Sequence, residues 1–137
     1  MRLRQQRLSH VRFLSAEWFE AMELAAATVE IPPGINVSVA HEVTDDSGGE
    51  VRWVLRCENG TCRVDRGDSR ATTTLRSKRA TALAIATGRL AASRAVLHGD
   101  LTIGGDPMQL VSATQALDVL APAFAAVGAE LDDGGPE

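Results

Sequence analysis

Cys57 and Cys62 are the two residues whose spacing points most directly to chemistry. They flank Glu58-Asn59-Gly60-Thr61, and Asn-Gly between two alternating stretches is the strongest short-range signal for a two-residue hairpin turn. Such a turn places positions 57 and 62 opposite each other as a non-hydrogen-bonded pair, with Cα atoms about 4.5 Å apart. A disulfide tolerates that separation. In a reducing cytoplasm, however, buried thiols acting as small apolar side chains are favoured, so we expect free cysteines.

The three histidines give little support to metal or acid–base chemistry. His10, His41 and His98 are scattered, and zinc held by the two cysteines would need two more soft ligands. His98 and Asp100 would share one face of a strand, as a general base and its orienting carboxylate do, but an outward solvated pair is the simpler interpretation. The sequence has no Gly-x-Ser-x-Gly and no phosphate loop ending in Gly-Lys-Ser/Thr. We therefore predict no catalytic residue, no metal site, no cofactor and no enzymatic activity.

His41 is the least ordinary of the three histidines. The alternation of apolar and polar residues over 35–44 points it inward, among Val37, Val39 and Val43. It could orient a ligand in an apolar cavity that Val39 and His41 line together. The alternative is a core histidine that is hydrogen-bonded to the backbone.

The elements that would position these residues follow from the two periods of secondary structure. Alternation predicts strands, whereas capping residues mark the ends of helices. We expect strands over 35–44, 51–57, 62–64, 71–76 and 97–103. We expect helices over 15–28, 77–87 and 91–96, and a last helix that begins at Pro107.

The last helix has the clearest start signal. Asp106 can cap it, Pro107 suits its first position, and Gln109 would complete a capping box. Pro122 should kink or end it. Its apolar stripe is expected to consist of Leu110, Ala113, Leu117, Leu120 and Phe124.

The order of these elements predicts an α+β fold, a mostly antiparallel sheet with helices over one face. A chain of 137 residues is expected to have one core. We assign 1–12 to a flexible basic arm, 13–130 to the domain and 131–137 to a disordered tail.

Composition argues against several partners and locations. The aromatic residues are two tryptophans and three phenylalanines, and the net charge is -4, so nucleic acid is not an expected partner. No apolar run follows the basic amino terminus as in a signal peptide, and no stretch comes near the ~20 apolar residues of a membrane helix. We expect a cytoplasmic protein whose membrane contact is at most peripheral, through the basic arm. Association with further copies of the chain stays open.

Several segments, in this order and spacing, resemble short bacterial stand-alone proteins of the sterol carrier protein 2 family. They are the opening Phe13-Leu14-Ser15-Ala16-Glu17-Trp18-Phe19, the strand Ala71-Thr72-Thr73-Thr74-Leu75, the stretch 82–90 that ends in Gly88-Arg89-Leu90, and the run 95–106. That last run contains the family-like pattern G-x-L-x-I-x-G-D, from Gly99 to Asp106. With the final helix, the resemblance covers nearly the whole chain. The carboxyl-terminal Gly-Gly-Pro-Glu departs from the Ser-Lys-Leu peroxisomal signal.

The resemblance implies a five-stranded sheet with helices on one face, and an apolar tunnel between the layers. It further implies that the tunnel binds or transfers a sterol, a fatty acid or an acyl-CoA without catalysis. The alternative function is an interaction or accessory module with a filled core, as in similar tails of alkylsulfatases and thiol-dependent isomerases. The residues that the resemblance indicates as lining the tunnel are Leu83, Leu90, Leu97, Leu101, Ile103, Leu117, Leu120 and Phe124. Val39 and His41 are added as candidates from the alternation over 35–44.

Overall fold

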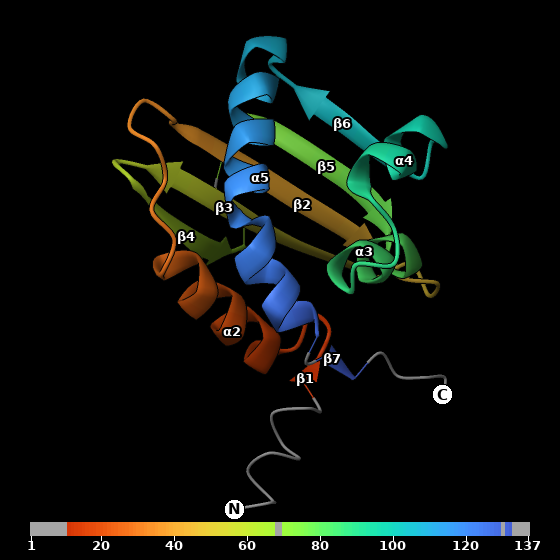
Figure 1. Cartoon of the computed structure of the whole chain (residues 1–137). Helices are drawn as coiled ribbons and strands as arrows, with labels where there is room; N and C mark the ends of the chain where they lie inside the picture. Colours follow the sequence, from red (N-terminus) through yellow and green to blue (C-terminus); the bar gives the residue numbers. More distant parts are fainter. Residues whose placement is uncertain (1–10, 68–69, 130, 133–137) are drawn as a thin grey trace, which may run out of the picture.

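The computed structural model describes residues 11–67, 70–129 and 131–132, in which helices cover one face of a sheet (Figure 1). The elements are, in chain order, β1 (Val11–Arg12), α2 (Ala16–Ala27), β2 (Val37–Thr44), β3 (Glu50–Glu58), β4 (Thr61–Arg66), β5 (Thr73–Lys78), α3 (Arg79–Ala86), α4 (Ala92–Leu97), β6 (Leu101–Gly105), α5 (Pro107–Gly128) and β7 (Leu131–Asp132). The predicted α+β fold is confirmed.

The main sheet has five strands in the order β4-β3-β2-β5-β6. β2 pairs in parallel with β5, and the other neighbours pair antiparallel, so the sheet is mostly antiparallel as predicted. β2 therefore lies at the centre, and its residues Val37 to Ala40 are buried on both faces of the sheet. After edge strand β4, the chain crosses to the other side of β2, where β5 and then β6 complete the sheet. These two strands lie beside the helices α3 and α4 (Figure 1).

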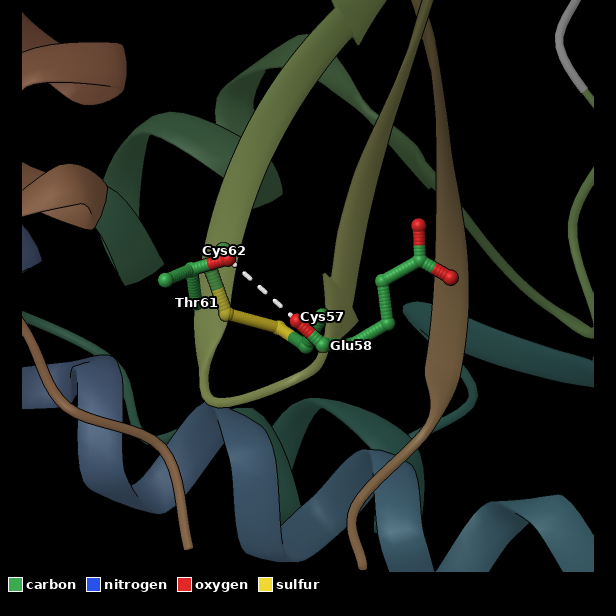
Figure 2. Close-up of a disulfide and its surroundings, with 4 residues drawn as sticks. All are labelled: Cys57, Glu58, Thr61 and Cys62. Carbon is green, nitrogen blue, oxygen red and sulfur yellow. Dashed lines mark hydrogen bonds between the residues drawn. A yellow bond between two sulfur atoms is a disulfide. The ribbon is translucent and has the colours of Figure 1, made fainter. Parts of the chain in front are cut away.

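The hairpin between β3 and β4 has the predicted turn. Asn59 and Gly60 have φ angles of 55° and 82°, and Cys57 faces Cys62 across the strands. Here the sequence expectation of free thiols is wrong, because the two cysteines are joined in a disulfide with Cα atoms 4.2 Å apart (Figure 2). Both are buried in the core, so the bond lies inside the fold and ties the hairpin together next to its turn.

Removing this disulfide with the double variant Cys57→Ala, Cys62→Ala is expected to lower the free energy of unfolding by about 2 kcal/mol, because the crosslink closes a short loop in the unfolded chain. Urea denaturation with and without a reductant measures the effect. Reductant should lower the midpoint of the wild type and leave that of the double variant unchanged. Equal midpoints of the wild type under both conditions would contradict a stabilising bond.

Helix α2 begins and ends where its capping residues predict. The Ser15 hydroxyl accepts a hydrogen bond from the Trp18 N–H at 3.1 Å, and Thr28 ends the helix. The helix buries Trp18 and Phe19, and both rings lie edge-on to the Trp53 ring of β3. This aromatic cluster attaches α2 to the β3–β4 side of the sheet.

The predicted strand over 97–103 begins four residues later than expected. Helix α4 continues through Leu97, His98 caps its carboxyl end, and Gly99 turns the chain with a φ of 80°. β6 therefore starts at Leu101. The alternation of Leu97, Gly99 and Leu101 is misleading, because the glycine leaves the helix through a positive φ angle that a strand does not use. His98 and Asp100 consequently do not share a strand face, and both are exposed.

Helix α5 starts at the predicted cap, but without the predicted capping box. Asp106 accepts a hydrogen bond from the Met108 N–H at 2.9 Å. Its own N–H donates to the carbonyl of Thr72, so it has no need of the Gln109 side chain. Pro122 does not end the helix, which continues to Gly128. The amino end of α5 is thereby hydrogen-bonded to the start of β5.

By length and composition, one helix among the described residues could cross a membrane: Met108–Gly128 in α5, with a mean hydropathy of 1.5. The expectation that no stretch comes near this composition is therefore wrong. In this fold the same helix contributes Ala113, Ala116 and Leu120 to the core. Of its most apolar window, 22% is buried inside the fold, so only part of its apolar surface belongs to the core.

The ends of the described chain lie side by side. β1 pairs in parallel with β7, so residues 11–12 and 131–132 form a second, two-stranded sheet. These four residues belong to the predicted arm and tail, and here they pair with each other as strands. Residues 1–10 and 133–137, the rest of the arm and of the tail, lie outside the described residues.

Candidate functional site

The face of the sheet that the helices cover carries a gradient of exposure. One row of side chains across the strands consists of Trp53, His41, Leu75 and Ile103. Trp53 on β3 is 5% exposed, whereas Ile103 on β6 is 40% exposed. An inward-facing isoleucine would be buried if the layers closed fully on β6. The helical layer therefore covers β2 and β3 closely and leaves part of the inner face of β5 and β6 accessible.

The residues predicted to line a tunnel fall into three groups. The buried ones are Val39, Leu83, Leu101 and Leu120. The partly buried ones are His41, Leu90, Leu117 and Phe124. The exposed ones are Ile103 and, at 83%, Leu97. The structure thus brings Val39, His41, Leu101 and Ile103 together on one sheet face and places Leu97 at the solvent-exposed end of α4. The tunnel itself stays a prediction.

One flank of α5 completes the accessible region. Leu110, Leu117 and Phe124 recur every seven residues, so they lie on one side of the helix, and each is only partly buried. Gly128 lies on the same side and is packed against the backbone of Ala86 in α3. This flank therefore faces the α3 side of the molecule, not α2. Leu110 and Leu75 belong to the region but were not among the predicted site residues, because alternation alone does not show how far a layer closes.

Four polar side-chain atoms are buried without a hydrogen-bond partner among the described residues. They are His41 Nδ1, Trp53 Nε1, Thr73 Oγ1 and Gln109 Oε1. The His41 ring is stacked parallel on Trp53 with centroids 3.8 Å apart. Burial lowers the pKa of His41 to about 4, with a hydrogen bond to the Val39 backbone opposing the shift, so the ring is neutral at pH 7. His41 points inward as the alternation predicts, and its Nδ1 has no hydrogen-bond partner among the described residues.

Two hollows lie away from this inner face. One of about 490 Å³ lies between the α2–β2 connection and the far side of α5, and it is lined by Pro32, Pro33, Gly34, Ile35, Gln115, Asp118 and Val119. Another of about 320 Å³ lies at the β5–β6 edge and includes Ile103 and Arg76. Of the predicted tunnel residues, only Ile103 lines either hollow.

The outer face of the sheet is covered by charged side chains. Glu42 binds Arg76 at 2.6 Å and Arg52 at 3.3 Å, and Arg56 binds Asp65 at 3.3 Å. The hydrogen bond from Arg76 is the main cause that holds the pKa of Glu42 below its ordinary value. These long side chains cover the apolar outer residues of β2 and β3. The described outer residues of β2 and β3 therefore form a solvated ionic surface.

Within the described ranges, no three His, Cys, Asp or Glu side chains lie close enough to bind a metal ion together. On the inner face the charged side chain next to Trp53 is Arg66 of β4, whereas the described polar groups of β2, β5 and β6 are neutral.

A family model described as the SCP-2 sterol transfer family matches residues 34–118. No curated protein sequence matches at a significant level. Among solved structures, a crystal structure of sterol carrier protein 2 is 19% identical, with 83% of this chain and 98% of that chain covered and a TM-score of 0.65. The solution structure of palmitated SCP2L2 from Aedes aegypti is 20% identical, with 77% and 95% covered and a TM-score of 0.60.

The sec-alkyl sulfatase PisA1 contains a similar part. The two are 20% identical, and the match includes 77% of this chain and 16% of the sulfatase chain, with a TM-score of 0.57. These structural similarities agree with the fold. The family model spans more than half of the sequence, from the turn before β2 into the middle of α5. The chain belongs to the SCP-2 sterol transfer family.

Proposed function

We propose that this protein binds or transfers an apolar molecule, a sterol, a fatty acid or an acyl-CoA, between the sheet and the helices, and that it does not change it chemically. Lipid binding or transfer in general is the function that goes with the family. The observation that carries the proposal for this chain is the accessibility of Ile103 on the inner face of β6.

The surroundings of Ile103 suit an elongated apolar ligand. Leu75 precedes it in the same row, and the flank of α5 with Leu110 and Leu117 faces the same region. Apolar surface that is removed from water contributes about 25 cal/mol per Å². A ligand lying between this flank and the β5–β6 strands would bury surface that the protein alone leaves partly exposed. The binding free energy would come mainly from that burial.

Ligand binding should raise the melting temperature by several degrees. A molecule that binds only the folded state, at about 100 times its dissociation constant, stabilises it by about 2.7 kcal/mol. We expect this shift from at least one of hexadecanoate, hexadecanoyl-CoA and cholesterol, and no shift from ATP. Native mass spectrometry of protein purified without detergent should detect a retained apolar molecule. If none of these lipids moves the melting curve while light scattering shows them dispersed, the carrier function fails.

A pair of tryptophan variants tests the location. Ile103→Trp places a large ring on the inner face, where the partly exposed side chain leaves room for it, and should abolish the shift. Thr102→Trp places the same ring on the opposite face of β6 and should preserve the shift. Equal behaviour of the two variants would place the ligand elsewhere.

An accessory or interaction module is the second candidate. The observation that favours it is the exposed apolar side of the first turns of α5, where Met108 is 80% and Val111 is 63% exposed. A part of an alkyl sulfatase is similar to this chain, so the fold also occurs within an enzyme. This function predicts concentration-dependent association, measured by analytical ultracentrifugation, that Met108→Glu abolishes, together with no thermal shift from any lipid.

A further inference from the structure

The interior holds polar atoms at the junction of β5 and α5 that the protein itself does not satisfy. Thr73 is 1% exposed, lies on the inner face opposite Val39, and its Oγ1 has no partner among the described residues. His41 stands two residues beyond Val39 on β2, which makes it the diagonal neighbour of Thr73. Gln109 lies in the first turn of α5, whose preceding residue Asp106 is hydrogen-bonded to Thr72.

Leaving these atoms unpaired is costly. A buried hydroxyl or amide oxygen without a partner costs about 1–3 kcal/mol, and valine has the shape of threonine without that cost. Gln109 is not used by the cap of α5, although its position suits a capping box. Buried polar groups in folded proteins are nearly always satisfied by protein, water or a ligand. Two of these groups are diagonal neighbours on the sheet, and the third lies in the first turn of the helix whose cap is hydrogen-bonded to Thr72. Three unsatisfied groups in this arrangement indicate a partner that the chain does not supply.

The surroundings determine the charge of that partner. The inner-face positions of β2, β5 and β6 carry no charged side chain among the described residues. Described α5 carries one charged residue, Asp118, which lines the hollow on its other side. Arg66 lies over the Phe19 ring, and Arg79 lies over the Phe13 ring. A buried carboxylate without a cation costs several kcal/mol, so an ionised head group would be poorly tolerated here.

We propose that Thr73, Gln109 and His41 form a subsite for the uncharged polar group of the ligand, and that the protein binds a neutral lipid with a hydroxyl group in preference to a carboxylate. A hydroxyl donates one hydrogen bond and accepts others, so it can donate to Gln109 Oε1 while it accepts from Thr73 Oγ1. Neutral His41 is an alternative acceptor for that single hydroxyl hydrogen, in place of Gln109. The inference rests on the proposed lipid binding and specifies which head group the interior accepts.

The test compares 1-hexadecanol with hexadecanoate at pH 8, both delivered from cyclodextrin and measured by titration calorimetry. The wild type should bind the alcohol at least about tenfold more tightly, since a tenfold ratio needs only about 1.4 kcal/mol. Thr73→Val should weaken 1-hexadecanol binding about fivefold, the value of one hydrogen bond. Thr73→Ser should restore most of the affinity. Thr74→Val, one residue along on the opposite face of β5, is the matched control and should leave the affinity unchanged.

Thr73→Val keeps the shape and β-branching of threonine and removes an unsatisfied hydroxyl, so its melting temperature without ligand should equal or exceed that of the wild type. Equal affinities of the wild type for the two ligands, or an unchanged affinity in Thr73→Val, would overturn the subsite while lipid binding stands. If neither 1-hexadecanol nor hexadecanoate binds, the proposed lipid-binding function itself is contradicted. The wild-type comparison needs no variant and is decisive even if a substitution impairs folding.

Discussion

Replacing Gly105 with alanine is expected to lower the free energy of unfolding by about 4 kcal/mol, which combines backbone strain with overpacking. Gly105 has a φ of 114°, a conformation that side chains rarely adopt. An added Cβ would overlap the carbonyl oxygen of Thr72 and lie 3.0 Å from the Cα of Thr73. Both contacts are backbone atoms of the neighbouring strand, so neither can rotate away.

The matched control is Gly104→Ala, one residue earlier. Gly104 has no positive φ, and nothing lies within 4 Å of its added Cβ, so its stability should change by no more than about 0.5 kcal/mol. Thermal and urea denaturation of the two variants measure the difference. Gly105 also joins β6 to the cap of α5, so Gly105→Ala should lose lipid binding as well. Similar stabilities of the two variants would mean that the close approach of β6 to β5 does not exist in solution.

The stability of the fold is expected to fall by about 2 kcal/mol between pH 7 and pH 5 because of His41. Burial lowers the pKa of this ring to about 4, against about 6.5 in the unfolded chain. The unfolded state therefore binds more protons between these two values, so the contribution is full above pH 6.5 and is lost as the pH falls toward 4. In its row the nearest charged side chain is Arg66, beyond Trp53.

The variant that isolates this effect is His41→Phe, which keeps a flat ring to stack on Trp53 and does not titrate. Its stability should change much less between pH 7 and pH 5 than that of the wild type. His98→Asn removes an exposed histidine and should behave like the wild type. Urea denaturation at pH 7, 6 and 5 gives the three slopes. Parallel slopes for the wild type and His41→Phe would show that the ring is solvated in the folded state.

Local features could be predicted from the sequence wherever a few adjacent residues decide the conformation. The Asn59-Gly60 turn, the caps Ser15 and Asp106, and the inward direction of His41 depend on backbone preferences and on a period of two or 3.6 residues, which act within a few positions. Where a local prediction was wrong, the cause is also a nearby residue or contact. Gly99 allowed α4 to run on where alternation predicted a strand, and the cap of α5 found a partner in Thr72 that made the Gln109 box unnecessary.

Only the tertiary structure decided how residues that are far apart along the chain come together. The sequence by itself determined an α+β fold with an apolar inner face, because alternation and capping are properties of neighbouring residues. It could not determine the parallel pairing of β2 with β5, the exposure of Leu97, or the placement of Thr73 and His41 as diagonal neighbours on the inner face. These depend on how closely one layer packs on another, and packing is set by all the side chains between two elements, not by the residues of either one.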